Sequence, residues 1–287
     1  DALDPVCGGT FAQPFNHRDT ASHCRFELER CIAQGGLLCQ RQPMMRNHRL
    51  VGGDETLTRI ERIYGILNGT CNYILSEMEQ TGADFGDMLR AAQEKGFAEA
   101  DPTFDVEGVD AAHKLAILAA IGFGARVDFD AVATTGIGEV QASDITQANV
   151  LGYVIRLVGI ASLDESDDEA RLLQRVRPCL VPRGHPLAAV TGPTNAVVAE
   201  GNFSGRLLFQ GAGAGAGPTA SAVVADLIDI ARGDSGAPFS VPVEELEPFA
   251  PADPGNAWGA TTFVSPSRIV RACWPKSPLP CATPKCR

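Results

Sequence analysis

The sequence lacks the features that mark a membrane protein or a nucleic-acid binder. It contains no run of about 18 consecutive apolar residues, the length that a membrane-spanning helix requires. Positive charge is scarce, because 24 Lys and Arg stand against 35 Asp and Glu, for a net charge of -11. Nucleic acids and membrane surfaces are bound by cationic faces, so we expect neither as a partner. The N-terminus is acidic and has no apolar h-region, which predicts no signal peptide and a cytoplasmic location.

Several motifs of metal and nucleophilic chemistry are also missing. The nine cysteines include no C-x2-C pair, and an odd count suits a disulfide framework poorly. We therefore expect reduced thiols and no metal site. The sequence has no P-loop, no H-E-x-x-H and no G-x-S-x-G. A glycosylation sequon at 68–70 has no secretory signal beside it, and we interpret it as a chance match.

Composition divides the chain into three parts. Residues 1–50 show no clear periodicity, and residues 248–287 are dense in proline. Both ends carry a positive net charge, so the acidic charge is concentrated in residues 51–247, which are also strongly patterned. We expect 51–247 to be the folded unit, and both ends to be disordered or non-native sequence.

Helical and extended patterns both occur within the folded unit. Apolar residues recur at helical spacing, with Gly or Pro near the ends, in segments 71–80, 85–95, 106–124 and 218–233. Apolar and β-branched segments bounded by Gly or Pro predict strands at 152–163, 170–181, 195–201 and 205–211. Helices that precede the strands, with one helix closing the unit, indicate an α+β fold rather than a βαβ alternation.

The densest group of polar residues lies between Gly96 and Lys114. Glu99 and Asp105 fall in a predicted loop, and Asp110 and Lys114 fall four residues apart on the helix that follows, hence on one face. A lysine held against carboxylates can donate a proton, or its acids can anchor an ammonium group. The alternative is an ordinary ion pair on a solvated helix, which the spacing alone favours. The apolar run after Lys114 predicts a buried helix and shifts the balance toward function.

A glycine run at 210–221 raises a second question. Its "GAGAGA" satisfies G-x-G-x-x-A, follows a predicted strand and precedes a predicted helix. A Rossmann fingerprint belongs in the first βα turn of a βαβ unit, whereas this run lies near the end of the patterned sequence, so we exclude that interpretation. Two interpretations stay open: a backbone that approaches a ligand closely, and a tight turn that packs a helix.

Three segments resemble successive signatures of one enzyme family. They are "RIERIYGILNGTCNYILSEM", "AQEKGFAEADPTFDVEGVDAAHKLAILA" and "QGAGAGAGPTASAVVADLIDIARG". In this order they are similar to homoserine dehydrogenase over roughly residues 55–245. The resemblance implies the catalytic domain of that family, a mixed sheet with helices packed on one face, without a complete Rossmann domain.

The resemblance also implies an activity and residue roles. The family interconverts L-aspartate 4-semialdehyde and L-homoserine with NAD or NADP, on the way to threonine and methionine. By this resemblance Lys114 is the proton donor to the aldehyde oxygen. Glu99 and Asp110 hold the amino and hydroxyl groups of this small-molecule substrate, and Asp105 lies nearby. The glycines that the resemblance brings close to the cofactor are Gly96, Gly213 and Gly215.

Parts of the family are not recognisable in this sequence. Residues 1–50 match neither its nucleotide-binding domain nor its monovalent-cation site, so we expect a truncated member with little activity alone. The preference for NAD or NADP cannot be predicted, because the acid or arginine that decides it belongs to that domain. Since the family usually pairs through this region, we expect a homodimer. The alternative function is a non-catalytic α+β module that keeps the fold as an oligomerisation or regulatory surface.

Overall fold

A computed structural model describes part of the chain. It describes residues 59–164, 169–233, 239 and 241–252, together with the backbone of 260–264 and 269–273. The predictions for residues 1–50 lie outside these ranges.

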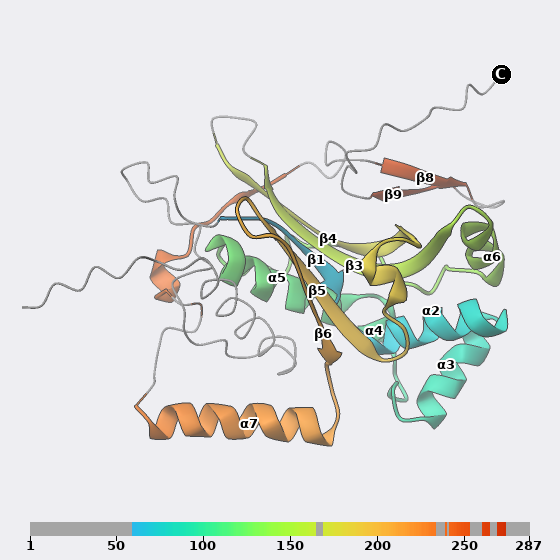
Figure 1. Ribbon diagram of the computed structural model, residues 1–287, viewed down its shortest axis with the longest axis horizontal. Helices are drawn as coiled ribbons and strands as arrows, with labels where there is room; N and C mark the ends of the chain where they lie inside the picture. The colour runs from blue at the N-terminus through green and yellow to red at the C-terminus, as the bar shows by residue number, and fades with distance from the viewer. Residues whose placement is uncertain are drawn as a thin grey trace, which may run out of the picture.

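A seven-stranded sheet forms the centre of the described structure (Figure 1). Its strand order is β2-β4-β3-β1-β5-β6, and β7 also pairs with β4. The central pairs are antiparallel, whereas β2 and β7 run parallel to β4. The strands are β1 Ile60–Ile66, β2 Ala133–Thr134, β3 Tyr153–Asp164, β4 Arg171–Pro182, β5 Thr194–Gly201, β6 Gly205–Ala212 and β7 Ala250–Pro251. The sheet is therefore mixed, as predicted.

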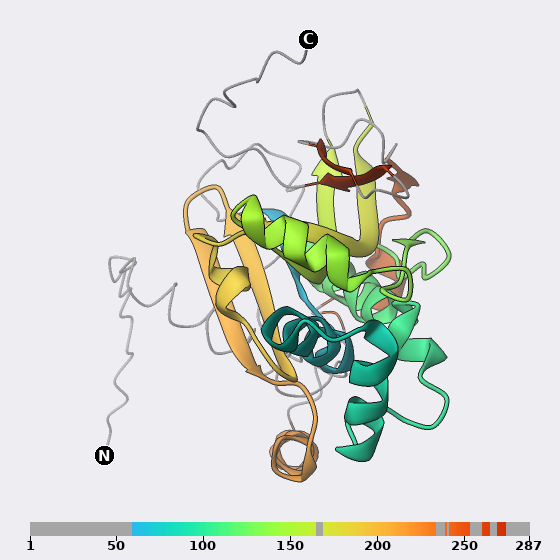
Figure 2. The ribbon, with the colours of Figure 1, turned by 90° about the vertical axis from the view of Figure 1, so that its right-hand side faces the viewer.

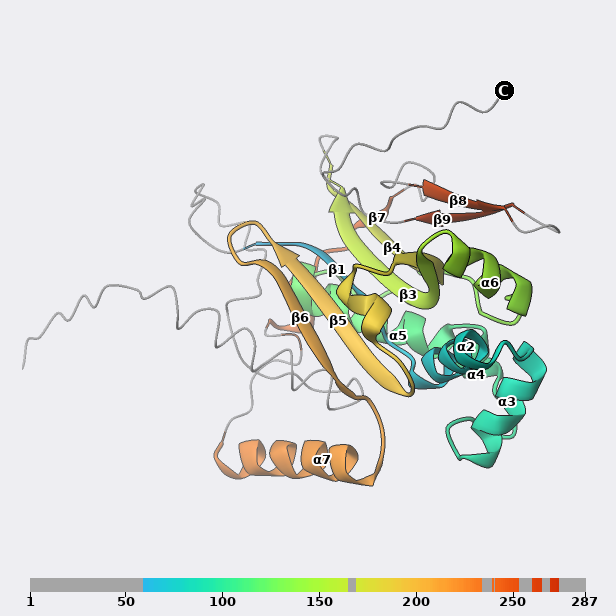
Figure 3. The same cartoon turned by 45° about the vertical axis from the view of Figure 1, so that its right-hand side comes forward.

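Helices cover one face of this sheet. They are α2 Gly69–Thr81, α3 Phe85–Glu94, α4 Thr103–Val106, α5 Val109–Phe123 and α6 Ala142–Val150. Contacts join α2, α5 and α6 to β3, and α2 lies between α3 and the sheet (Figure 3). The core on this face combines apolar residues of the helices and the strands. The predicted α+β class, with helices packed on one face, is confirmed.

The opposite face buries a smaller cluster under a short 3-10 helix, η2 Pro186–Ala189. Leu187 and Val190 close this cluster over the central strands. A second 3-10 helix, η3 Val243–Glu245, follows the last long helix, α7 Ala216–Ala231. No residue of α7 is buried, and Figures 1, 2 and 3 all show α7 apart from the sheet.

Several element boundaries differ from those that the sequence predicts. The segment 106–124 is not one helix, because α4 ends at Val106 and α5 begins only at Val109. Gly108, with φ of 81°, separates the two, so Asp105 lies on a helical turn rather than in a loop. Neither β1 nor α6 was predicted from the sequence. Residues 248–287 were expected to lack regular structure, yet they contain β7 and an antiparallel hairpin of β8 Ala260–Val264 and β9 Ile269–Cys273.

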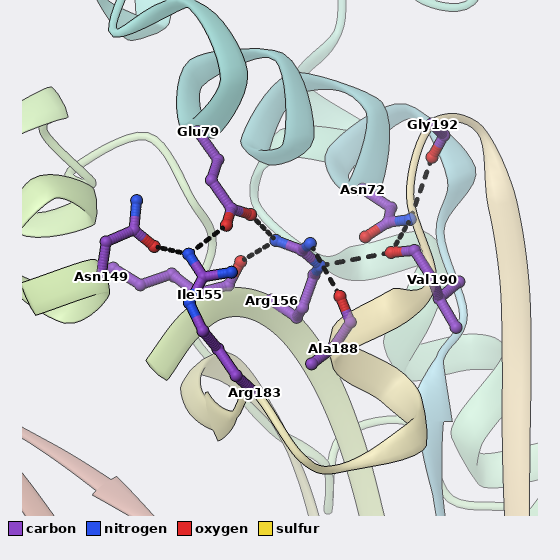
Figure 4. A network of polar contacts seen from close by, with 9 residues as sticks. All are labelled: Asn72, Glu79, Asn149, Ile155, Arg156, Arg183, Ala188, Val190 and Gly192. Atoms are coloured by element: carbon purple, nitrogen blue, oxygen red, sulfur yellow. Dashed lines mark hydrogen bonds and ion pairs between the residues drawn. The ribbon is translucent and has the colours of Figure 1, made fainter. Parts of the chain in front are cut away.

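A buried arginine ties α2 to the sheet and to the loop before β5 (Figure 4). The side chain of Arg156, on β3, is 1% exposed and pairs with Glu79 of α2 at 3.0 Å. Its remaining donors bind the carbonyl oxygens of Ile155, Ala188 and Val190. An uncompensated charge at this depth would cost several kcal/mol, roughly 3–5 on removal of one partner, so the pair fixes α2 against the strands.

A second buried polar group lies on the η2 side of the sheet. Nδ1 of His185 accepts a hydrogen bond from the Leu187 backbone at 3.2 Å, which puts the proton of the neutral ring on Nε2. That nitrogen lies 3.4 Å from Oη of Tyr64, which in turn donates to Glu200 at 2.8 Å. Burial, followed by the charge of Arg206, lowers the pKa of His185 to about 4. The imidazole is therefore neutral in the folded protein at neutral pH.

We expect His185 to make folding stability pH-dependent in weakly acidic solution. Its pKa is about 4 when folded, against 6.5 for an ordinary histidine, so the unfolded chain binds the extra proton between these values. The contribution of His185 to stability should be fully present above pH 6.5. The free energy of unfolding should therefore fall by about 1–2 kcal/mol from pH 7 to pH 5. Urea unfolding measures it. In His185→Asn, whose amide oxygen can still accept from Leu187, the loss should be smaller, and an equal loss in both proteins would contradict this.

Candidate active site

The first turn of α2 organises the polar residues that the sequence singles out. Asn68 is the N-cap, in an extended conformation, and its Oδ1 accepts a hydrogen bond from the Cys71 backbone at 2.8 Å. Asparagine is among the best N-caps because its short side chain satisfies an otherwise unpaired N–H of the first turn. The Asn68 side chain is buried, so this end of α2 lies inside the protein.

Lys114 and Asp110 form an ion pair on α5, facing this turn. The Nζ of Lys114 lies 2.8 Å from Oδ2 of Asp110 and 3.2 Å from the carbonyl oxygen of Leu67. The two side chains are 24% and 21% exposed. The pair of Arg90 and Asp87 on α3 is 72% and 56% exposed. Lys114 is thus partly shielded, to about the same degree as Arg62 in its pair with Glu200, whereas the pair on α3 is solvated.

Asp105 joins the same cluster through Asn68. The Nδ2 of Asn68 donates to Oδ1 of Asp105 at 2.7 Å and to Oδ2 of Asp110 at 2.8 Å. One amide therefore bridges two carboxylates that come from different helices. Asp105, Asp110 and Lys114, which the sequence predicts as site residues, lie together in the structure.

Cys71 borders this cluster but is not a candidate nucleophile. Its Sγ donates to the carbonyl oxygen of Asp105 at 3.1 Å. Burial raises the pKa of the thiol well above its ordinary value, and the charges of Asp105, Asp110 and Glu107 raise it further, against the opposing effect of Lys114. A thiol that stays protonated has little nucleophilic reactivity. Three carboxylates and one ammonium group thus act on the Cys71 thiol.

Glu99 is the predicted site residue that the structure does not bring into the cluster. It is exposed, and only its backbone carbonyl has a partner here, Nε2 of Gln93 at 2.9 Å. Its loop is nevertheless tied to the site, since Oγ1 of Thr70 donates to the carbonyl oxygen of Phe97 at 2.7 Å. Gly96 precedes Phe97, in a left-handed conformation with φ of 74°.

The glycine run approaches the first turn of α2 through one side chain. A Cβ added at Gly213 would clash with Nδ2 of Asn195, and a Cβ added at Gly69 would lie 3.5 Å from Oδ1 of Asn195. Asn195 thus separates Gly213 from the first residue of α2. Gly215 is the N-cap of α7, with φ of 116°, a value that side-chain-bearing residues rarely adopt.

The side chains in this cluster are suited to proton transfer to a polar ligand. A partly shielded ammonium can donate a proton, and the surrounding carboxylates can hold cationic or hydroxyl groups. Among the described residues, no group of three or more His, Cys, Asp and Glu side chains is placed to hold a metal ion. In the same part of the chain, no helix is both long and apolar enough to cross a membrane.

Two polar residues of this region, Asn68 and Asn195, were not predicted from the sequence. The only sequence motif at Asn68 is a glycosylation sequon, which we interpret as a chance match. Asn195 lies in a predicted strand, where its amide gave no motif. Both are buried, at 4% and 7% exposure, and a buried amide usually has a specific partner.

Comparison with known proteins finds one family. The family model described as homoserine dehydrogenase matches residues 48–228. The homoserine dehydrogenase of Synechocystis is 55% identical over 172 residues, which cover 60% of this chain and 40% of that protein. That of Pseudomonas aeruginosa is 48% identical over 196 residues, which cover 68% of this chain and 44% of that protein. The chain therefore spans less than half the length of these curated relatives.

Solved structures agree with the sequence relatives. The homoserine dehydrogenase from Thiobacillus denitrificans superposes with a TM-score of 0.62 at 48% identity, covering 68% of this chain and 46% of that chain. One from S. aureus gives a TM-score of 0.57 at 41% identity, covering 61% and 43%. The family resemblance of the three quoted segments is confirmed.

We expect Gly213→Ala to destabilise the protein and Gly217→Ala not to. The new methyl group at Gly213 forces the buried Asn195 to move, so the free energy of unfolding should fall by about 1–3 kcal/mol. A Cβ at Gly217 meets nothing within 4 Å, and alanine on α7 should be neutral or stabilise by up to about 1 kcal/mol. Urea unfolding of the two variants measures the difference. Equal effects would contradict the contact between Gly213 and Asn195.

Proposed function

The chain belongs to the homoserine dehydrogenase family, and from this premise we propose that its described residues hold and protonate the substrate of such an enzyme. The proposed reaction is the NAD(P)-dependent interconversion of L-aspartate 4-semialdehyde and L-homoserine. The observation that carries the proposal is the partly shielded pair of Lys114 and Asp110 at 2.8 Å, beside the first turn of α2.

Lys114 is the proposed proton donor. The carbonyl oxygen of the semialdehyde gains negative charge as its carbon is reduced, and an ammonium group within hydrogen-bond reach stabilises that charge and then donates a proton. Asp110 orients Nζ of Lys114 by accepting its hydrogen bond. The 24% exposure of the lysine side chain leaves a route by which solvent restores the proton. In the oxidation of homoserine the same amine accepts the hydroxyl proton.

The acids are proposed to hold the rest of the substrate. Asp105, Asp110 and Glu107 act together on the Cys71 thiol with only Lys114 opposing them, so the local charge is negative. A negative site attracts the α-ammonium group that both homoserine and aspartate semialdehyde carry. Glu99 is proposed to join on substrate binding, since its loop is held by Thr70 and its carboxylate is exposed.

The family uses NAD(P), and the glycine run is the part of this chain that fits such a group. Bound NAD(P)H supplies the hydride that reduces the carbonyl carbon. No described atom lies within 4 Å of a Cβ added at Gly211 or Gly217, so the backbone there can be approached closely. Within the described residues, the buried Oδ1 of Asn195 has no hydrogen-bond partner, which suits an amide-bearing ligand. We propose Gly96, Gly213 and Gly215 as cofactor contacts, and we do not assign a preference between NAD and NADP.

The alternative function, a non-catalytic interaction module, would use an apolar surface. Such a surface exists on α7, whose large apolar side chains are exposed: Val223, Val224, Leu227, Ile228 and Ile230. We place the catalytic proposal first, because an interaction surface does not require a shielded lysine and carboxylates. A homodimer, a cytoplasmic location and a monovalent-cation site stay predictions from the resemblance and the sequence.

We expect the chain alone to oxidise L-homoserine with NADP very slowly or not at all. Positioning of the hydride donor supplies much of the rate, and a dinucleotide-binding fingerprint is not recognisable in this sequence. Absorbance at the wavelength of the reduced cofactor measures turnover. Robust turnover by the purified chain would refute this expectation.

In a chimera completed with the part of the Pseudomonas aeruginosa relative that this chain does not cover, we expect Lys114→Ala to lower kcat by about 10²–10⁴-fold. The free energy of unfolding should change little, because the ion pair is only partly buried. Arg90→Ala, which removes the exposed pair on α3, is the matched control and should leave kcat unchanged. Unchanged kcat in both variants would overturn the role of Lys114 as the proton donor.

A further inference from the structure

The side chain of Asn68 uses all of its strong hydrogen-bonding groups at once. Its Oδ1 caps α2 at the Cys71 backbone, 2.8 Å away. Its Nδ2 donates to Asp105 at 2.7 Å and to Asp110 at 2.8 Å. Oδ2 of Asp110, the atom that Asn68 binds, is also the atom that binds Lys114. The amide therefore reaches the proposed proton donor through one intervening oxygen.

A neutral amide has a specific electrostatic consequence at this position. Two carboxylates that share a small space repel each other, and the pKa of one of them rises unless donors stabilise both charges. The Nδ2 group supplies one hydrogen bond to each carboxylate without adding a positive charge. The Nδ2 group thus holds Asp105 and Asp110 side by side, next to Cys71 and Lys114.

The position of Asn68 is fixed by hydrogen bonds and an ion pair that other residues of α2 make outside the cluster. One turn along α2, Nδ2 of Asn72 binds the carbonyl oxygens of Val190, Gly192 and Thr194, between 2.9 and 3.3 Å. Near the other end of α2, Glu79 pairs with the buried Arg156, and Figure 4 shows both anchors on the same helix. A shift of α2 would break these contacts, so the helix carries the amide on a rigid support.

We infer that Asn68 is a positioning residue for the reaction: its amide sets the orientation of Asp105 and Asp110, and through Asp110 the orientation of Lys114. The inference rests on the proposed function, and it assigns to Asn68 a role beyond capping α2. The nearby titratable groups are Asp105, Asp110, Glu107, Cys71 and Lys114.

Two variants separate this role from helix capping. Asn68→Asp and Asn68→Ser both keep a good N-cap, because Asp and Ser cap helices about as well as Asn. Both lose the two N–H donors to Asp105 and Asp110. Thr81→Ala is the matched control, since it removes a side-chain hydrogen bond at the other end of α2, to the Glu77 carbonyl. Circular dichroism melting checks that all three fold.

The measurement is an NMR titration of this chain, with L-homoserine binding as the second readout. The carboxyl carbons of Asp105 and Asp110 are assigned with Asp→Asn variants. Because each carboxylate loses a hydrogen bond to its charged form, we expect both Asn68 variants to raise the pKa of at least one of the two carboxyls. Affinity for L-homoserine should fall by about tenfold in both, and Thr81→Ala should match the wild type.

The outcomes are distinguishable. Wild-type titrations of Asp105 and Asp110 in both Asn68 variants would overturn the inference and leave Asn68 as a helix cap only. Failure of the wild-type chain to bind L-homoserine would count against the proposed function instead. In that case shifted titrations in the Asn68 variants would still support its effect on the carboxylates.

Discussion

The bridging of Asp105 and Asp110 by one amide is the contact on which the arrangement of the site depends. Neither carboxylate is placed by its own helix alone, because α4 is one short turn and α5 begins after a break. Asn68 brings both acids to the start of α2, and α2 is itself anchored by Glu79 and Arg156. The positions of the two acids therefore depend on the sheet, because the sheet fixes α2 and α2 fixes Asn68.

Most of the fold could be predicted from local pattern, and the exceptions have physical reasons. Four predicted strands and the helices around α2, α3 and α7 occur near their expected positions. The strand β1 was missed because it lies between β3 and β5 and is buried on both faces, so "IERIYGI" shows no clean alternation. The helix α6 was missed because "ASDITQANV" is short and mostly polar, with three buried residues.

The site could be predicted only as far as local spacing reaches. Lys114 and Asp110 are four residues apart on one helix, so their pairing follows from helical geometry. Asn68 lies 37 and 42 residues from the acids it binds, and a neutral amide leaves no charge pattern to suggest it. Asn195 could not be predicted either, because it too is a neutral amide and only the folded sheet brings it between Gly69 and Gly213.

The left-handed Gly108 has a consequence for protein engineering. On one continuous helix, Asp105 and Asp110 would point about 140° apart, and no single side chain could hold both. Common stabilising designs replace such a glycine with a strong helix former and lengthen the helix. Here a β-carbon would also crowd Thr134, at 3.1 Å from its Cγ2, and a straightened helix would turn one acid away. Thermostabilisation of this chain should therefore leave that interruption intact, because the contact of both acids with Asn68 and a continuous helix conflict at this residue.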